Sequence, residues 1–204
     1  WIHRGFLAVT EKVLRRKGKK PGTQENRGRF NGKRTIKDRS QEVESREIFG
    51  HWELDTMVSS RGQSKGCLAT FVERKTRFYV AIKMDDRTKD SMFLAISSLY
   101  NTLTSKLLKT FTVDRGKKFA CFEQVETEFG IPMYFADAYA AWQRGSNENS
   151  NGLLREFFPK KTDLAKVTLD KLTEALMLIN NRPRKCLGFK TPFDMFKHVI
   201  RKLI

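Results

Sequence analysis

The chain has 204 residues, of which 39% are hydrophobic and 16 are Phe, enough to bury the core of one ordinary domain with an appendage. Its 40 Lys and Arg against 23 Asp and Glu give a formal net charge of +17, which favours a polyanionic partner because phosphate contacts release condensed counterions. No run of about 18 apolar residues is present, which excludes a membrane-spanning helix. The three cysteines are scattered and form no CxxC pair, which argues against disulfides and structural zinc and fits a reduced, cytoplasmic setting.

Residues 1–45 are predicted to form a basic arm ahead of the folded core. Between residues 11 and 39 lie 12 basic residues, four Gly and one Pro, with few apolar side chains, a composition typical of linkers. Such a segment is either a solvated tether or an arm that follows a DNA backbone. We expect DNA contacts from its cations, namely Arg15, Arg16, Lys17, Lys19, Lys20, Arg27, Arg29, Lys33 and Arg34.

The core begins with three β-rich runs that predict an antiparallel meander, residues 49–60, 66–76 and 77–86. Helical and strand patterns then alternate to the end of the chain. Helices are expected over 88–105, 117–130, 147–159, 168–183 and a last segment starting near Pro192, with strands over 109–116 and 131–137. The order βββ-α-β-α-β-α-α predicts an α/β fold, a mixed sheet flanked by helices.

Three carboxylates stand where such a fold presents ligands. Asp55 lies within the first predicted strand, Asp114 at the carboxyl end of the fourth, and Glu148 at the start of a helix. Hard oxygens converging from separate elements suit a pair of divalent metal ions, which clamp the attacking and leaving oxygens of a phosphoryl transfer. Each residue alone has an ordinary alternative, as a polar strand residue, a turn cap and a favourable helix-start charge. Only the three carboxylates together indicate a metal site for phosphoryl transfer.

Several strings of the sequence identify a family. The string DRG at 114–116, WQRGSNENSNGLLREFFPKKTDL at 142–164 and INNRPRKCLGFKTP at 179–192 closely resemble the IS-thirty family of insertion-sequence transposases. Residues 50–77 resemble the first catalytic strand and hairpin of that family. The resemblance covers about residues 10 to 204, and its motifs are several, long and in the right order.

The resemblance implies a ribonuclease H-like, retroviral-integrase-type catalytic core over 46–204, with the DDE triad on Asp55, Asp114 and Glu148. It implies Mg²⁺ as the natural metal, two ions per site, with Mn²⁺ as a substitute. The implied activity is cleavage of transposon-end DNA and transfer of the 3′-hydroxyl ends into target DNA, by a homodimer or higher assembly in the bacterial cytoplasm at the nucleoid. Family members carry helix-turn-helix domains upstream that this chain lacks.

One position departs from the pattern of this family and related integrases. The fourth residue after the second Asp is often Glu there, and here it is Lys118. The change puts a positive charge beside the expected metal site. Three consequences of this lysine are open: no effect, a higher affinity for phosphate, or weaker catalysis.

Other residues are weaker candidates. Glu53 is a possible auxiliary metal ligand, because it shares a strand face with Asp55, and Asp137 is a weaker one. DNA contacts are expected from the loop and helix around Glu148, at Arg144, Asn151, Arg155, Lys160 and Lys161. The alternative for the last four is an exposed polar helix face or compensation of a helix dipole. Trp142 either stacks on a splayed base or closes the core under its loop, and we favour the core.

Three functions compete. The first is the DNA strand-transferase, the second a ribonuclease H-like metal nuclease that cuts without joining, and the third an inactive DNA-binding relic. Products in which a 3′-hydroxyl end is joined to new DNA distinguish the strand-transferase from the nuclease. The third predicts salt-sensitive DNA binding that is unaffected by loss of Asp114.

Overall fold

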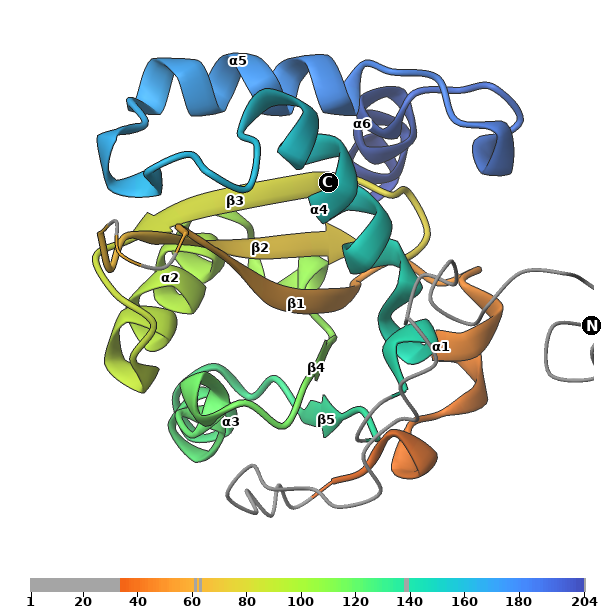
Figure 1. Ribbon diagram of the computed structural model, residues 1–204. Coiled ribbons are helices and arrows are strands. Elements are labelled where there is room, and N and C mark those ends of the chain that lie inside the picture. The colour runs from red at the N-terminus through yellow and green to blue at the C-terminus, as the bar shows by residue number, and fades with distance from the viewer. Residues whose placement is uncertain (1–33, 61, 63, 138–139, 204) are drawn as a thin grey trace, which may run out of the picture.

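The computed structural model describes residues 34–203 apart from 61, 63, 138 and 139 (Figure 1). The strands are β1 (His51–Val58), β2 (Cys67–Glu73), β3 (Tyr79–Met84), β4 (Thr110–Val113) and β5 (Met133–Phe135). The α-helices are α1 (Gln41–Ser45), α2 (Lys89–Thr102), α3 (Phe122–Phe129), α4 (Gly145–Phe157), α5 (Leu169–Asn180) and α6 (Pro192–Leu203). None of the described helices is long and apolar enough to cross a membrane.

The strands form one mixed sheet in the order β3-β2-β1-β4-β5. β1, β2 and β3 pair antiparallel, which confirms the predicted meander, whereas β4 pairs parallel with β1 and β5 parallel with β4. Because β1 and β4 are parallel neighbours, their carboxyl ends point to the same edge of the sheet. This register brings Asp55, near the end of β1, towards Asp114, which follows β4 directly.

Side chains alternate between two hydrophobic layers on either face of the sheet. From β1, Trp52 and Leu54 enter a core built with α2 and α3, to which α6 adds Phe196 and Val199. On the opposite face, Met57 packs in a second core with residues of α4 and α5. Glu53 and Asp55 point to the same face of the sheet as Met57, because they precede it by four and two residues, and they lie under α4. The helices thus cover both faces, as Figure 1 shows.

The helix ends follow from local chemistry. The Thr88 side chain accepts from the amide of Ser91 at the start of α2, and Gly130 ends α3 in the left-handed conformation at φ +67°. Two apolar side chains at helix ends face solvent: Leu169, which begins α5, is 67% exposed, and Phe157, which ends α4, is 40% exposed.

The boundary between arm and core also needs correction. Residues 34–45, assigned to the arm, belong to the folded domain: Thr35 bridges to Phe135 of β5, and Ile36 and Val43 are buried. The buried Arg39 guanidinium donates to Thr112 on β4 at 3.0 Å. Arg34 forms an ion pair with Glu126 of α3. The other predicted DNA-contacting cations of the arm, from Arg15 to Lys33, lie outside the described residues.

Candidate active site

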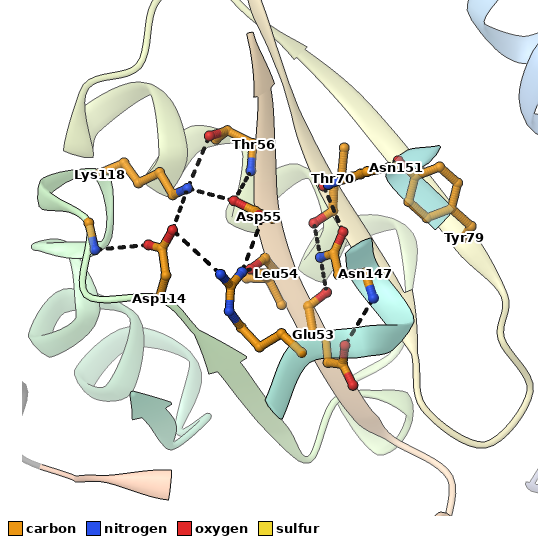
Figure 2. Close-up of polar contacts among 12 residues, drawn as sticks. Glu53, Leu54, Asp55, Thr56, Thr70, Tyr79, Asp114, Lys118, Asn147 and Asn151 are labelled. Atoms are coloured by element: carbon orange, nitrogen blue, oxygen red, sulfur yellow. Dashed lines mark hydrogen bonds and ion pairs between the residues drawn. The ribbon is translucent and has the colours of Figure 1, made fainter. Parts of the chain in front are cut away.

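Asp55 and Asp114 converge at the edge of the sheet on a single cation, the ammonium of Lys118 (Figure 2). The Lys118 Nζ lies 2.8 Å from Asp55 Oδ1 and 3.2 Å from Asp114 Oδ2. Asp55 comes from within β1 and Asp114 from the residue after β4, so the parallel pairing of the strands makes the convergence. The sequence therefore placed these two carboxylates correctly on their elements.

The loop after β4 is shaped around Asp114. The Gly116 amide donates to Asp114 Oδ1 at 2.8 Å. A Cβ atom on Gly116 would lie only 2.7 Å from the same oxygen, so a larger residue would push the carboxylate aside. Asp114 is half-buried, and one of its oxygens is fixed by the backbone while the other faces Lys118.

Arg144 is a second cation at the carboxylate pair. It lies at the end of a 3-10 turn (Ala141–Arg144) that precedes α4, and its guanidinium nitrogens are 3.1 Å from Asp55 Oδ2 and 3.8 Å from Asp114 Oδ2. The sequence predicts a DNA contact from Arg144; in the structure its side chain is 15% exposed and pairs with the two aspartates. Its Nε atom is buried without a hydrogen-bond partner in the described structure.

These charges fix the ionisation of Asp55. Burial raises the pKa of the Asp55 carboxyl, but the positive charges of Lys118 and Arg144 and the hydrogen bonds from Lys118 and the Thr56 amide outweigh burial. The net result is a pKa below the ordinary value of 3.8. Asp55 is therefore a carboxylate at neutral pH, which is the form that binds metal ions.

Glu148 lies in the first turn of α4, as predicted, and its side chain is exposed. Among the described residues, no three His, Cys, Asp or Glu side chains gather closely enough to hold a metal ion. The structure therefore brings together two members of the predicted triad and leaves the third apart on the neighbouring helix.

Glu53 anchors α4 to the sheet. Its side chain is fully buried, with one oxygen paired to Arg74 and the other accepting from the Asn147 amide at 3.0 Å. The Asn147 side chain donates to the Glu53 carbonyl at 2.9 Å and accepts from Thr70 at 3.1 Å (Figure 2). Both carboxylate oxygens of Glu53 are thus occupied, a geometry that does not support the predicted role as an auxiliary metal ligand.

The remaining candidates divide into anchored and free side chains. Asn151 accepts from the Tyr79 hydroxyl at 2.7 Å, and Arg155 donates to the carbonyls of Val58, Phe158 and Pro159. Both therefore have structural partners. Asp137 forms an ion pair with Arg115 at 3.4 Å and takes no part in the ion pairs of Asp55 and Asp114.

Trp142 and two lysines are the free candidates. Lys160 and Lys161 are exposed. Trp142 is 77% exposed, so the expectation that it closes the core was wrong. It lies on the 3-10 turn that ends at Arg144.

Sequence reasoning missed the buried polar partners of the site. The sequence shows Lys118 only as a charge reversal, and it does not single out Arg74 or Asn147. The signal for Asn147 was its place beside Glu148 in the helix, and for Arg74 its place in the turn after β2. Neither position distinguishes a buried polar group from an exposed one.

Known sequences resemble the chain over most of its length. Residues 45–141 match the model of the integrase core domain (rve). The chain is 40% identical over 162 residues to the transposase InsI for insertion sequence element IS30A of Escherichia coli (strain K12), covering 79% of this chain and 42% of that protein. It is 35% identical over 196 residues to the transposase for insertion sequence element IS4351 of Bacteroides fragilis, covering 94% and 59% respectively.

Comparison with solved structures gives the same fold. The catalytic core domain of BIV integrase matches with a TM-score of 0.59 at 18% identity, over 76% of this chain and 98% of that one. The HTLV-2 integrase catalytic core domain in complex with magnesium (trimeric form) matches with a TM-score of 0.55 at 19% identity, over 72% and 95%. These likenesses confirm a ribonuclease H-like core.

The chain spans about half the length of the curated relatives it matches. The sheet order, the two converging aspartates and the sequence matches agree with one another. Residues 45–141 therefore resemble the integrase core domain, and the chain is similar in sequence to the transposases of these insertion sequences.

Proposed function

We propose that this chain is the catalytic domain of a DDE transposase that cleaves transposon-end DNA and transfers the resulting 3′-hydroxyl ends into target DNA. The observation that carries the proposal is the convergence of Asp55 and Asp114, from neighbouring parallel strands, on one position, which the Lys118 ammonium occupies. The transposase names of the relatives support it. In cleavage, a water oxygen bonds to phosphorus as the 3′-oxygen leaves. In transfer, the freed 3′-hydroxyl attacks a target phosphodiester and replaces one of its P–O bonds.

We assign metal binding to Asp55, Asp114 and Glu148. Carboxylate oxygens are the donors that Mg²⁺ prefers, and the two aspartates already converge on one cation, so Asp55 and Asp114 offer two of the three donors that the proposal needs. The magnesium in the related HTLV-2 core supports the choice of metal. When bound, two Mg²⁺ or Mn²⁺ ions would supply activation of the attacking oxygen and stabilisation of the leaving one. Glu148 has to approach the aspartates through a change of its rotamer or of α4.

DNA is the proposed substrate, and we propose that exposed side chains around this site contact it. We expect Trp142, exposed on the turn before α4, to stack on an unpaired base, and the exposed Lys160 and Lys161 to contact phosphates. The basic arm ahead of residue 34 extends the contact. We further propose that the protein acts as a dimer or higher assembly on paired ends, on DNA of the bacterial nucleoid, with upstream domains reading the terminal repeats.

The test is a strand-transfer assay with the full-length protein, labelled ends of its own element, a supercoiled target plasmid and Mg²⁺ or Mn²⁺. We expect joined products that vanish in Asp114→Asn and Glu148→Gln. The matched control is Asp137→Asn, which removes a carboxylate paired only to Arg115 and Gln143 among the described residues and should leave joining intact.

Cleaved ends without joined products would replace the proposal with the metal nuclease. DNA binding without any product, unchanged in Asp114→Asn, would replace it with the inactive DNA-binding relic. Lys118 between the aspartates is the observation that favours this last alternative.

A further inference from the structure

The Lys118 ammonium is buried in a site that uses all of its hydrogen-bonding capacity. Its three N–H groups meet three acceptors, Asp55 at 2.8 Å, Thr56 Oγ1 at 3.0 Å and Asp114 at 3.2 Å (Figure 2). The side chain is 1% exposed. A lysine is almost never buried to this degree unless it is paired, and here the pairing is complete.

The backbone around Lys118 holds the ammonium in this position. Lys118 lies in a 3-10 turn (Lys117–Phe119) that starts directly after Gly116, and the next side chain, Phe119, is fully buried in the core. A Cβ atom on Gly116 would lie 3.6 Å from Lys118 Cε, an ordinary contact distance, but only 2.7 Å from Asp114 Oδ1, so the glycine preserves the position of the carboxylate that Lys118 contacts. The neighbouring Lys117, by contrast, is exposed.

Charge balance at the carboxylate pair follows from these contacts. Among the described residues, Asp55 and Asp114 form ion pairs with Lys118 and Arg144, so two negative charges meet two positive ones. Lys118 is the closer cation and bridges both aspartates, whereas Arg144 is 3.8 Å from Asp114. A divalent ion that joined the pair with both cations in place would raise the local charge to +2 and meet their repulsion at short range.

We propose that Lys118 is an internal cation that occupies the metal position between Asp55 and Asp114, and that a divalent metal binds there only by displacing it. The inference rests on the proposed metal site and adds its regulation. Without metal, Lys118 keeps the two carboxylates together. The protein then binds metal more weakly than its carboxylates alone would allow, since part of the binding free energy goes into moving a satisfied, buried ammonium.

The first test measures Mn²⁺ binding to the DNA-free full-length protein by titration calorimetry. Lys118→Gln is expected to bind Mn²⁺ about tenfold or more tightly than the wild type, within the range usual for coupled binding events. Lys118→Arg, which keeps the charge, should stay near the wild type. The matched control Lys117→Gln removes the same charge one residue away and should change nothing. Asp114→Asn, combined with each, should abolish the binding.

The second test uses the wild-type protein and so does not depend on the folding of a variant. Its lysines are acetylated briefly with and without Mn²⁺, and each site is quantified by mass spectrometry. Acetylation of Lys118 should be slow without metal and rise several-fold with it, whereas the exposed Lys117 should react equally in both.

The outcomes separate the inference from the function on which it rests. Equal Mn²⁺ affinity in wild type and Lys118→Gln, lost in both with Asp114→Asn, would overturn the displacement while the metal site stands. Weaker binding by Lys118→Gln, or metal-independent acetylation of Lys118, would overturn it as well. Mn²⁺ binding that ignores Asp114 in every variant would overturn both.

Discussion

Two polar residues on β1, one half-buried and one buried, show how the surroundings of a single side chain set its charge. Asp55, near the carboxyl end, stays ionised because Lys118 and Arg144 lie within ion-pair distance. His51, at the first position of the strand, is 1% exposed, and its Nδ1 lies 2.8 Å from Thr110 Oγ1. Its Nε2 is buried without a hydrogen bond in the described structure, and the nearest carboxylate oxygen, on Glu42, is 3.7 Å away.

His51 gives a prediction for stability against pH. Burial lowers the pKa of the folded His51 imidazole from 6.5 to about 4. The unfolded chain therefore binds more protons between these values, so the free energy of unfolding falls as pH drops from 6.5 towards 4. The full loss from this residue is about 3 kcal/mol, at about 1.4 kcal/mol for each pH unit of the shift. Urea unfolding at pH 7, 6 and 5 measures it.

His51→Gln isolates the contribution of that imidazole. The variant is expected to be less stable than the wild type at pH 7, and the difference should shrink as pH falls. His198→Gln, which removes an exposed histidine on α6, serves as the matched control and should follow the wild-type profile. Parallel profiles for wild type and His51→Gln would show that His51 does not carry the pH dependence.

At the scale of elements, α4 is held on the sheet by polar contacts along its first two turns. Ser146 accepts from Arg77, Asn147 joins Glu53 and Thr70, and Asn151 accepts from Tyr79. Apolar packing begins further along, at Leu154. The position of Glu148 relative to Asp55 therefore depends on hydrogen bonds to β1, β2 and β3 more than on hydrophobic burial.

Asn147→Ala is predicted to loosen this attachment. It removes the side-chain bonds to the Glu53 carbonyl and to Thr70 and leaves buried groups unsatisfied, which costs about 1–3 kcal/mol. Strand transfer should fall more than stability alone explains, because Glu148 is the next residue. Urea unfolding and the joining assay at a temperature where the variant is folded measure the two effects.

Asn149→Ala is the matched control on the same helix. Asn149 is exposed, so its loss should change stability by less than about 0.5 kcal/mol and leave joining intact. If Asn147→Ala and Asn149→Ala behaved alike in both measurements, the polar anchor would have no part in holding α4.

The same helix shows what the sequence could and could not predict. Alternating β-rich runs and helical spacing gave the element types and their order, and Asp55, Asp114 and Glu148 fell on the elements expected for them. The burial of Asn147 and Glu53 could not be predicted, because a polar residue on a helix or strand has the same pattern whether it meets water or a partner from a distant segment. Arg144 falls on the turn before the helix, as expected, but nothing in the sequence indicates its ion pairs with Asp55 and Asp114.

At the scale of the molecule, the chain combines a two-layered core with a strong positive charge that is unevenly distributed. Residues 1–33 hold ten Lys and Arg and two Glu, nearly half of the net charge of +17. Composition alone extended this arm to residue 45, although residues 34–45 pack on the domain. The two buried apolar residues of that segment, Ile36 and Val43, stand among many charged neighbours, so its composition resembles that of the arm. A short segment with two buried side chains has the composition of a linker.

The arm is expected to dominate the salt dependence of DNA binding. Replacing Arg15, Arg16, Lys17, Lys19 and Lys20 with Gln should lower the slope of log affinity against log salt by about 0.9 for each phosphate that these side chains neutralise. The matched control replaces five exposed cations near and on α6, Lys185, Lys190, Lys197, Arg201 and Lys202, with Gln. Both variants have the same net charge, so a difference in slope between them reports direct binding of phosphates by the arm. Equal slopes in the two variants would mean that the arm acts only through its contribution to the overall field, and a slope unchanged from wild type in the arm variant would remove it from the DNA interface.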